Sequence, residues 1–357
     1  MSTKVIVSIP TFEPEYDGNP QVETFYTTNF ESFLDPEGPF SVELILSDFR
    51  SSDPFKAFLR RLADRHPGKI YVIDGQAKAG GPHAVNMGFR LRPYDIAVYA
   101  ASDCRARDRQ WLGQLVRDFE DPKVFASYAT SGFESSHLVE QLQAEAIERP
   151  SRHLVFPESA IPNVVAYRRQ LLEPFGHRWS DFNYLDPLSG LAWQLEAVDG
   201  VATVNFRCNI LHEHFFDEGR YNRHKSSHWH ADRTEQDRLK RAVFYYLPIP
   251  ISMLNPRHTV PPIIAPLIEG WREQGLRGLA RAAYIRGRRS QIMYVWWQIK
   301  LWGFWGYLGQ HWRVKRRLRA FHQMDQTRRC ALVNALYFEN EIFYDQLSYS
   351  VYPEIKS

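Results

Sequence analysis

VELILSDFRSSD, residues 42–53, is the stretch that decides the fold. It opens with five mostly apolar and β-prone residues, Val42 to Leu46, stops on a carboxylate at Asp48, and continues as a polar turn that ends at Asp53. A mostly apolar run of this length is typical of a buried strand, and a proline directly after Asp53 is typical of the first turn of a helix. The stretch therefore predicts a strand that delivers an acid to one edge of a sheet, followed by a helix that Asp53 caps.

Strand and helix signals alternate through the first 105 residues. Strand patterns lie at 4–10, 69–75 and 95–103, and helix patterns lie between them at 21–34, 53–68 and 80–92. Strands that alternate with helices at this spacing pair in parallel through right-handed crossovers. The sequence therefore predicts an α/β fold with an open, mainly parallel sheet that helices flank.

Two of the predicted strands end on an acid, one at Asp48 and one at Asp103. In open α/β sheets, ligands bind beyond the carboxyl ends of the strands. We therefore expect both side chains to project into one crevice. A plainer interpretation of Asp48 stays open, because aspartate also begins turns well.

A proline cluster at 247–267 divides the chain. We expect residues 1–246 to form the α/β domain and residues 247–357 to form a mostly helical region. Residues 271–330 hold fourteen Arg and Lys against two acids, and six of the ten tryptophans lie in the same part of the chain. The overall charge of +3 hides this asymmetry, which predicts two regions with different partners.

The bulk composition is that of a globular protein, with 44% hydrophobic and 24% charged residues among 357. Three scattered cysteines without a CxxC pair indicate a reducing compartment, with neither a disulfide framework nor a structural zinc site. The N-terminal apolar run is short and leads into a polar turn, so we interpret it as the first strand and not as a signal peptide. These features favour a cytoplasmic location.

Four motifs follow one another in the first third of the chain: VSIPTF, ELILSDFRSSD, GGPHAVNMG and YAASDCRARDRQWL. In this order and at this spacing they resemble the motifs of the family 2 glycosyltransferases, which share the GT-A fold. The likeness covers about residues 3–240. It implies a GT-A type sheet and the transfer of a sugar from a nucleotide-diphosphate donor.

The resemblance also implies a nucleoside pocket. Pro10, Thr11 and Phe12 would line it, and Asp48 would accept hydrogen bonds from the base or the ribose, as a carboxylate does well. Asn86 would lie on the helix that packs beside the ribose. For Asn86, the alternative of ordinary helix-start chemistry stays open.

A divalent cation, Mn²⁺ or Mg²⁺, is implied at the end of the fourth strand, where hard oxygen ligands would bridge it to the donor diphosphate. Asp103, next to Ser102, is the expected ligand. The family usually has Asp-x-Asp here, whereas this chain has Ala101 in place of the first acid. His212 and His214 fall where the family often places a histidine that serves the metal or the diphosphate. A surface histidine pair near a loop is the alternative.

The catalytic base implied by the resemblance is a carboxylate that deprotonates the acceptor hydroxyl in a single inverting displacement. Asp186 is the candidate and Asp181 the fallback, although Leu185 replaces the usual Glu. Asp186 before a proline is equally typical of a helix N-cap. We further expect cations of a loop at 215–240 to stabilise the departing diphosphate, with the candidates Arg220, Arg223 and Lys225.

Residues 291–323 combine Trp and Tyr with flanking Arg and Lys. This composition is typical of a helix that lies in a membrane interface against anionic lipid. A tryptophan-rich helix buried against the catalytic domain is the alternative, and the run is short for a bilayer span.

Together these patterns predict a cytoplasmic glycosyltransferase of polysaccharide biosynthesis, with peripheral contact to the inner membrane face through 291–323. Its donor would be a UDP-, GDP- or dTDP-sugar, and its acceptor a glycan or a lipid-linked glycan. No nucleic acid is expected as a partner. Two alternatives stay open: a nucleotidyltransferase, and a non-catalytic nucleotide-sugar-binding protein of polysaccharide assembly that keeps the fold.

Overall fold

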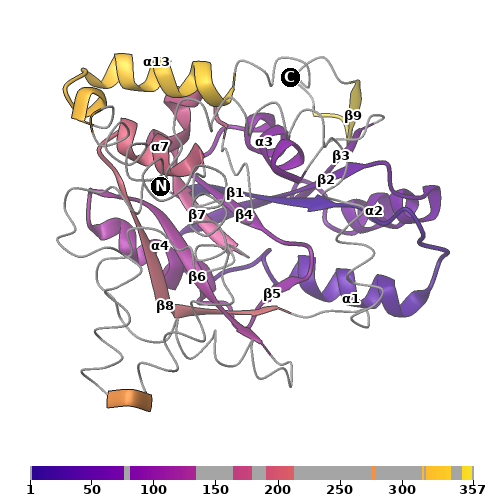
Figure 1. Ribbon diagram of the computed structural model, residues 1–357. Coiled ribbons are helices and arrows are strands. Elements are labelled where there is room, and N and C mark those ends of the chain that lie inside the picture. Colours follow the sequence, from indigo (N-terminus) through magenta and orange to yellow (C-terminus); the bar gives the residue numbers. More distant parts are fainter. Residues whose placement is uncertain are drawn as a thin grey trace.

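One sheet runs through the part of the chain that the structure describes. The computed structural model describes residues 2–75, 81–133, 164–178, 190–212, 275–277, 316, 319–338 and 348–355. The strands within them form a nine-stranded sheet in the order β5-β8-β6-β7-β4-β1-β2-β3-β9 (Figure 1). They are β1 (Thr3–Thr11), β2 (Phe40–Phe49), β3 (Ile70–Gly75), β4 (Ile96–Ala100), β5 (Cys104–Ala106), β6 (Val124–Phe133), β7 (Val164–Arg168), β8 (Val201–His212) and β9 (Tyr349–Tyr352).

Most strands of the sheet run in one direction. β2 and β4 both pair in parallel with β1, β3 pairs in parallel with β2, and β8 with β6. β7 is antiparallel to both β4 and β6, and β5 and β9 are antiparallel edge strands. The predicted open and mainly parallel α/β sheet is therefore confirmed.

Helices cover both faces of the sheet (Figure 1). On one face, α1 (Pro20–Glu31), α2 (Asp53–Arg65) and α4 (Trp111–Val116) pack over a hydrophobic cluster that includes Phe30, Phe55 and Trp111. On the other face, α3 (Gly81–Leu91), α7 (Gly190–Ala197) and α13 (Gln326–Tyr337) pack over a second cluster that includes Phe89 and Val333. The short elements are η1 (Arg117–Glu120), α6 (Arg169–Leu172) and η2 (Glu173–Phe175).

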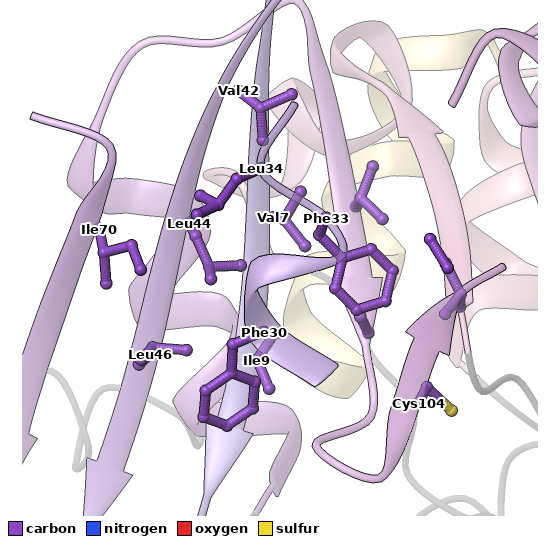
Figure 2. Close-up of a cluster of buried hydrophobic side chains, with 14 of the residues drawn as sticks. Val7, Ile9, Phe30, Phe33, Leu34, Val42, Leu44, Leu46, Ile70 and Cys104 are labelled. Atoms are coloured by element: carbon purple, nitrogen blue, oxygen red, sulfur yellow. The ribbon is translucent and has the colours of Figure 1, made fainter. Parts of the chain in front are cut away.

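The register of β1 and β2 explains why the apolar run of the opening stretch stops on an acid. Side chains on a strand alternate between the two faces, so each face receives every second residue. On the α1 face, Val7 lies opposite Leu44 and Ile9 lies opposite Leu46, as Figure 2 shows for the four side chains. The next pair in this row is Thr11 opposite Asp48. A polar pair thus ends an apolar row at the carboxyl edge of the sheet.

The predicted cap of the second helix is wrong by one residue. The N-cap of α2 is Ser52, with extended backbone, and Asp53 is the first helical residue, with Pro54 in the first turn. The Ser52 hydroxyl does not cap the helix, because it donates to the carbonyl oxygen of Tyr16 at 2.8 Å. Asp53 is exposed in the first turn, where a carboxylate favours the positive end of the helix dipole.

Parts of the C-terminal region are built into the sheet domain. β9 extends the sheet antiparallel to β3, with Tyr352 opposite Val72, and the Tyr352 hydroxyl donates to Asp64 on α2 at 2.6 Å. On α13, the buried Arg329 forms a two-pronged ion pair with Asp199, with N–O distances of 2.7 and 2.5 Å. The predicted boundary at residue 247 lies outside the described residues and stays a prediction. None of the described helices is long and apolar enough to cross a membrane.

Helix α3 lies so close to β1 that one of its positions accepts only glycine. A Cβ built on Gly88 would overlap the hydroxyl oxygen of Ser8 and would lie 2.8 Å from Ser8 Cβ, and both lie in the interior. Ser8 cannot swing away freely, because its hydroxyl donates to the carbonyl oxygen of Val85 on α3 at 3.1 Å.

We expect Gly88→Ala to lower the free energy of unfolding by about 2 kcal/mol, because overpacking outweighs the gain in helix propensity. Urea denaturation of the purified protein measures the change. Gly113→Ala is the matched control on α4, since its nearest non-local atom lies 3.9 Å away. The prediction fails if both variants are as stable as the wild type.

Candidate functional site

Asp48 is held at the carboxyl edge of the sheet by neighbours from two other segments. Its side chain is fully buried, and Oδ1 accepts a hydrogen bond from Thr11 Oγ1 at the end of β1, at 3.1 Å. The hydroxyl of Ser51 donates to the same carboxylate, and the backbone N–H of Ser51 does so at 3.4 Å. The acid therefore joins the ends of β1 and β2 to the turn that precedes α2.

The surroundings of Asp48 change its acidity. Burial raises the pKa of Asp48 to about 6, while the hydrogen bonds from Ser51 and Thr11 and the charge of Lys56 act in the opposite direction. An isolated aspartate titrates near 3.9, so a buried carboxylate is kept here at a cost in stability. Groups with such shifts are concentrated at functional sites.

Glu13, just after β1, continues this polar cluster. Its backbone N–H donates to Ser51 Oγ at 2.7 Å, and its carbonyl oxygen accepts from the backbone N–H of Ser52 at 3.0 Å. Its buried carboxylate accepts a hydrogen bond from the Tyr26 hydroxyl of α1. Burial and the charge of Glu13 raise the pKa of Tyr26 well above its usual value, so the phenol keeps the proton that it donates.

The sequence predicts Asp103 at the end of a strand, but the structure has it in a turn. β4 ends at Ala100, and the backbone N–H of Cys104 donates to the carbonyl oxygen of Ala101 at 3.1 Å, which closes a tight turn before β5. The carbonyl oxygen of Ser102 accepts from Asn29 Nδ2 of α1 at 3.2 Å. Asp103 itself is half-buried.

Helix α1 connects the two acidic positions. Its Tyr26 donates to the carboxylate of Glu13, and its Asn29 donates to the carbonyl oxygen of Ser102. A chain of contacts thus runs from Asp48 through Ser51 and Glu13 to α1, and from α1 to the turn that carries Asp103.

The remaining predicted residues fall into two groups. Pro10 and Phe12 are half-buried at and just beyond the end of β1, and Asn86 is buried on α3. His212 is the last residue of β8, and β5–β8 pairing places its backbone opposite Cys104, directly after Asp103. The others lie outside the described residues: Asp181, Asp186, His214, Arg220, Arg223 and Lys225.

Within the described ranges, no group of three or more His, Cys, Asp or Glu side chains is arranged to hold a metal ion. The donor types present at the turn are nevertheless suitable for one. Asp103 offers a carboxylate oxygen, the type of ligand that Mn²⁺ and Mg²⁺ prefer, and strand pairing places the backbone of His212 opposite Cys104, the residue after Asp103.

Sequence reasoning missed Asp74, an acid with the same placement as Asp48. It lies opposite Asp48 in the β2–β3 pairing, near the carboxyl end of β3. Its buried carboxylate pairs with Lys56 and with Arg60 of α2, both at 2.8 Å. The signal was present, because the third predicted strand also ends in an acid and a glycine. Glu13 and Tyr26 were missed too, and no strand-end pattern marks either one.

The pKa of Asp48 generates a prediction on stability. Between about pH 4 and pH 6 the folded protein binds a proton at Asp48 that the unfolded chain has released, so the free energy of unfolding falls as the pH rises through this window. Asp48→Asn removes this titration. As the pH rises through the window, we expect the free energy of unfolding of the variant to increase relative to that of the wild type by up to about 3 kcal/mol.

Urea denaturation at a series of pH values measures this difference. Asp35→Asn is the control, because Asp35 is exposed and pairs only at the surface with Lys69 among its described contacts. If the free energies of unfolding of the wild type and of Asp48→Asn differ by a constant amount between pH 4 and pH 7, the raised pKa of Asp48 is contradicted.

Among the comparisons with known proteins, only the one with solved structures finds proteins that this chain is similar to. No family model and no curated protein matches it. The chain is similar to mannosyltransferase PcManGT from Pyrobaculum calidifontis in complex with GDP-Man and Mn²⁺, at 16% identity and a TM-score of 0.47, over 97% of this chain and 88% of that one.

It is also similar to S. aureus TarS, at 13% identity and a TM-score of 0.40, over 57% of this chain and 35% of that one. For TarS 1-349 in complex with UDP-GlcNAc, the values are 16% and 0.44, over 61% and 60%. This chain thus spans less than two thirds of either TarS chain. Two of these solved structures hold a nucleotide sugar, GDP-Man in one and UDP-GlcNAc in the other.

Proposed function

We propose that this chain is a glycosyltransferase that moves a sugar from a nucleotide-diphosphate donor to a glycan or lipid-linked acceptor, with inversion and with a divalent cation. One observation supports the proposal most directly. Asp48 and the turn that carries Asp103 follow parallel strands at the same edge of the sheet, and Ser51, Glu13 and helix α1 join them. That edge is where open α/β sheets bind nucleotides.

The end of β1 and β2 would hold the nucleoside. Pro10 and Phe12 supply main chain and a ring beside the Thr11–Asp48 pair, and Asn86 lies on the helix packed against the same strand. An ionised Asp48 would accept from N–H or O–H groups of the base or ribose. Because binding such donors favours the charged form, the nucleoside would offset part of the desolvation that raises the pKa of Asp48.

The β4–β5 turn would hold the diphosphate through a divalent cation. Asp103 would supply the carboxylate and His212 an imidazole, since strand pairing brings their backbones together. When bound, the cation neutralises the charge that develops on the departing nucleotide. The loop cations Arg220, Arg223 and Lys225 would assist, and His214 would be a further ligand.

A carboxylate from the stretch before α7 would act as the base. Asp186, with Asp181 as the fallback, would accept the proton of the acceptor hydroxyl while the sugar is transferred in a single displacement. Support for this location comes from the ends of the stretch. The buried Gln194 of α7 donates from Nε2 to the carbonyl oxygen of Arg178 at 2.8 Å, so described residues from the two sides of the stretch are in contact.

A non-catalytic nucleotide-sugar-binding protein is the second candidate, and Ala101 favours it, because the first acid of the usual metal motif is absent. A nucleotidyltransferase is disfavoured. It would need a basic, glycine-rich loop after the first strand, whereas this segment carries Glu13, Glu15 and Asp17.

The first test is a thermal-shift screen of UDP, GDP, dTDP and CDP with and without Mn²⁺. A nucleotide that binds only the folded protein stabilises it by about 2.7 kcal/mol at a hundredfold excess over its dissociation constant. We expect one of the four to raise the melting temperature, more strongly with Mn²⁺. No shift with any of them would refute the proposal.

The second test separates catalysis from binding. In the wild type we expect slow hydrolysis of the donor with Mn²⁺ and a stabilisation that depends on Mn²⁺. Asp103→Ala should lose both effects, and Asp108→Ala should keep both. Asp108 is the matched control, because it is exposed five residues further along and accepts only a local backbone hydrogen bond among those described. Nucleotide binding without hydrolysis of any UDP-, GDP- or dTDP-sugar supports the non-catalytic candidate.

We also propose that residues 291–323, of which the structure describes only 316 and 319–323, contact an anionic membrane surface and give access to a lipid-linked acceptor. The full-length protein should float with vesicles that contain anionic lipid and should be released by high salt. Absence from the floating fraction would remove this part of the proposal and leave the sugar-transfer part standing.

A further inference from the structure

A row of polar residues crosses the carboxyl edge of the sheet and ends on the C-terminal strand β9. Strand pairing places each of its four members opposite the next: Thr11, Asp48, Asp74 and Ser350. Neighbouring strands lie about 4.8 Å apart, so β9 lies about 10 Å from β2. The C-terminal strand therefore belongs to the same edge as Asp48, where we propose that the nucleoside binds.

A second row lies one residue further along and carries aromatic rings. Phe49 of β2 lies opposite Gly75 of β3, and Gly75 lies opposite Tyr349, the first residue of β9. A Cβ on Gly75 would overlap the Phe49 ring, so this ring lies across the glycine, on the face that α3 covers. Because paired residues share a face of the sheet, Tyr349 belongs to that face as well.

The two rings of this row differ in exposure. Phe49 is 2% exposed, whereas Tyr349 is 49% exposed. Exposure by itself indicates nothing, since tyrosine favours strands and single apolar groups are common on protein surfaces. The position is informative. Tyr349 offers an open aromatic ring at the end of a row that begins at the residue after Asp48, and nucleobases stack on such rings.

The C-terminal segment is anchored on both faces of the sheet. The Tyr352 hydroxyl donates to Asp64 of α2 at 2.6 Å, and the Tyr352 ring packs against the hydrophobic cluster under α1 and α2. Ile355 packs against the cluster of the opposite face. β9 is thus fixed beside β3 and presents Tyr349 from a defined place (Figure 1).

The acid between Asp48 and β9 does not oppose a nucleotide. Asp74 pairs with Lys56 and with Arg60, both at 2.8 Å, so its charge is compensated. Ser350, the next member of the polar row, is exposed and carries a hydroxyl. The surface from Asp48 to β9 can therefore accept an uncharged, flat group such as a nucleobase.

We propose that Tyr349 binds the donor's nucleobase by stacking, while Asp48 binds the polar groups of the nucleoside. The inference rests on the proposed function and adds a residue to its donor site from the far end of the chain. It gives β9 a role in binding besides covering the edge of β3. Because every base has a flat face, the ring would contribute affinity for any of the candidate nucleotides.

The test measures nucleotide affinity by calorimetric titration of the full-length protein with Mn²⁺, using the nucleotide that stabilises it most. We expect Tyr349→Ala to weaken binding about tenfold, as for the loss of one base–aromatic stack. Tyr349→Phe keeps the ring and should bind as the wild type does. Leu332→Ala on α13 is the control, because Leu332 is also partly open to solvent, at 39% exposure, and should leave binding unchanged.

Two further measurements show whether the effect comes from the base. Pyrophosphate with Mn²⁺ carries no base, so Tyr349→Ala should bind it as tightly as the wild type. Tyr349→Leu keeps an apolar side chain on β9 without a flat ring, and it should weaken nucleotide binding as Tyr349→Ala does. The leucine variant also serves if Tyr349→Ala does not fold.

The outcomes separate this inference from the proposed function. If the wild type binds none of the nucleotides, the proposed function fails and the stacking role fails with it. If the wild type binds a nucleotide and Tyr349→Ala and Tyr349→Leu bind it equally well, only the stacking role is overturned. An equal loss of affinity for the nucleotide and for pyrophosphate would also overturn it, because the base would then not be the group that Tyr349 contacts.

Discussion

The parallel pairing of β1 with β2 is the constraint on which the rest of the structure depends. Its register carries a row of apolar pairs along the α1 face and ends that row with Thr11 opposite Asp48. A shift by one residue would turn the acid to the other face and the apolar row away from α1. The buried row between Val7 and Leu46 therefore fixes where the carboxylate lies, and the site follows from the core (Figure 2).

The carboxyl edge of the sheet concentrates negative charge, and the fold compensates for it unevenly. Asp74 is neutralised by Lys56 and Arg60, which α2 sends down to the sheet. Asp48 instead has hydroxyl and N–H donors, with the charge of Lys56 further away, and its pKa is raised to about 6. Asp74 is thus held by ion pairs. Asp48 is held by hydrogen bonds, which it can exchange for hydrogen bonds from a ligand.

Sequence patterns predict the parts of the fold and site that depend on local order. Strand runs, helix starts and strand-end acids are local features. The parallel sheet, and Asp48 as a candidate site residue, could therefore be predicted from the sequence. The Tyr26–Glu13 contact joins residues thirteen positions apart, and the hydrogen bond from Asn29 to Ser102 depends on how α1 crosses the β4–β5 turn. β9 was missed for the same reason, because its pairing with β3 joins distant segments.

The far side of the sheet constrains the segment from which a base would come. Arg329 of α13 donates to the carbonyl oxygen of Glu196 at 3.1 Å as well as to Asp199, and so closes the C-terminal end of α7. Gln194 ties the middle of α7 to Arg178, where the chain leaves the described structure. The described residues that flank 179–189 are therefore held to one another and to α13. Helix α13, from the region predicted to be separate, stabilises the very element that would bring a base to the site.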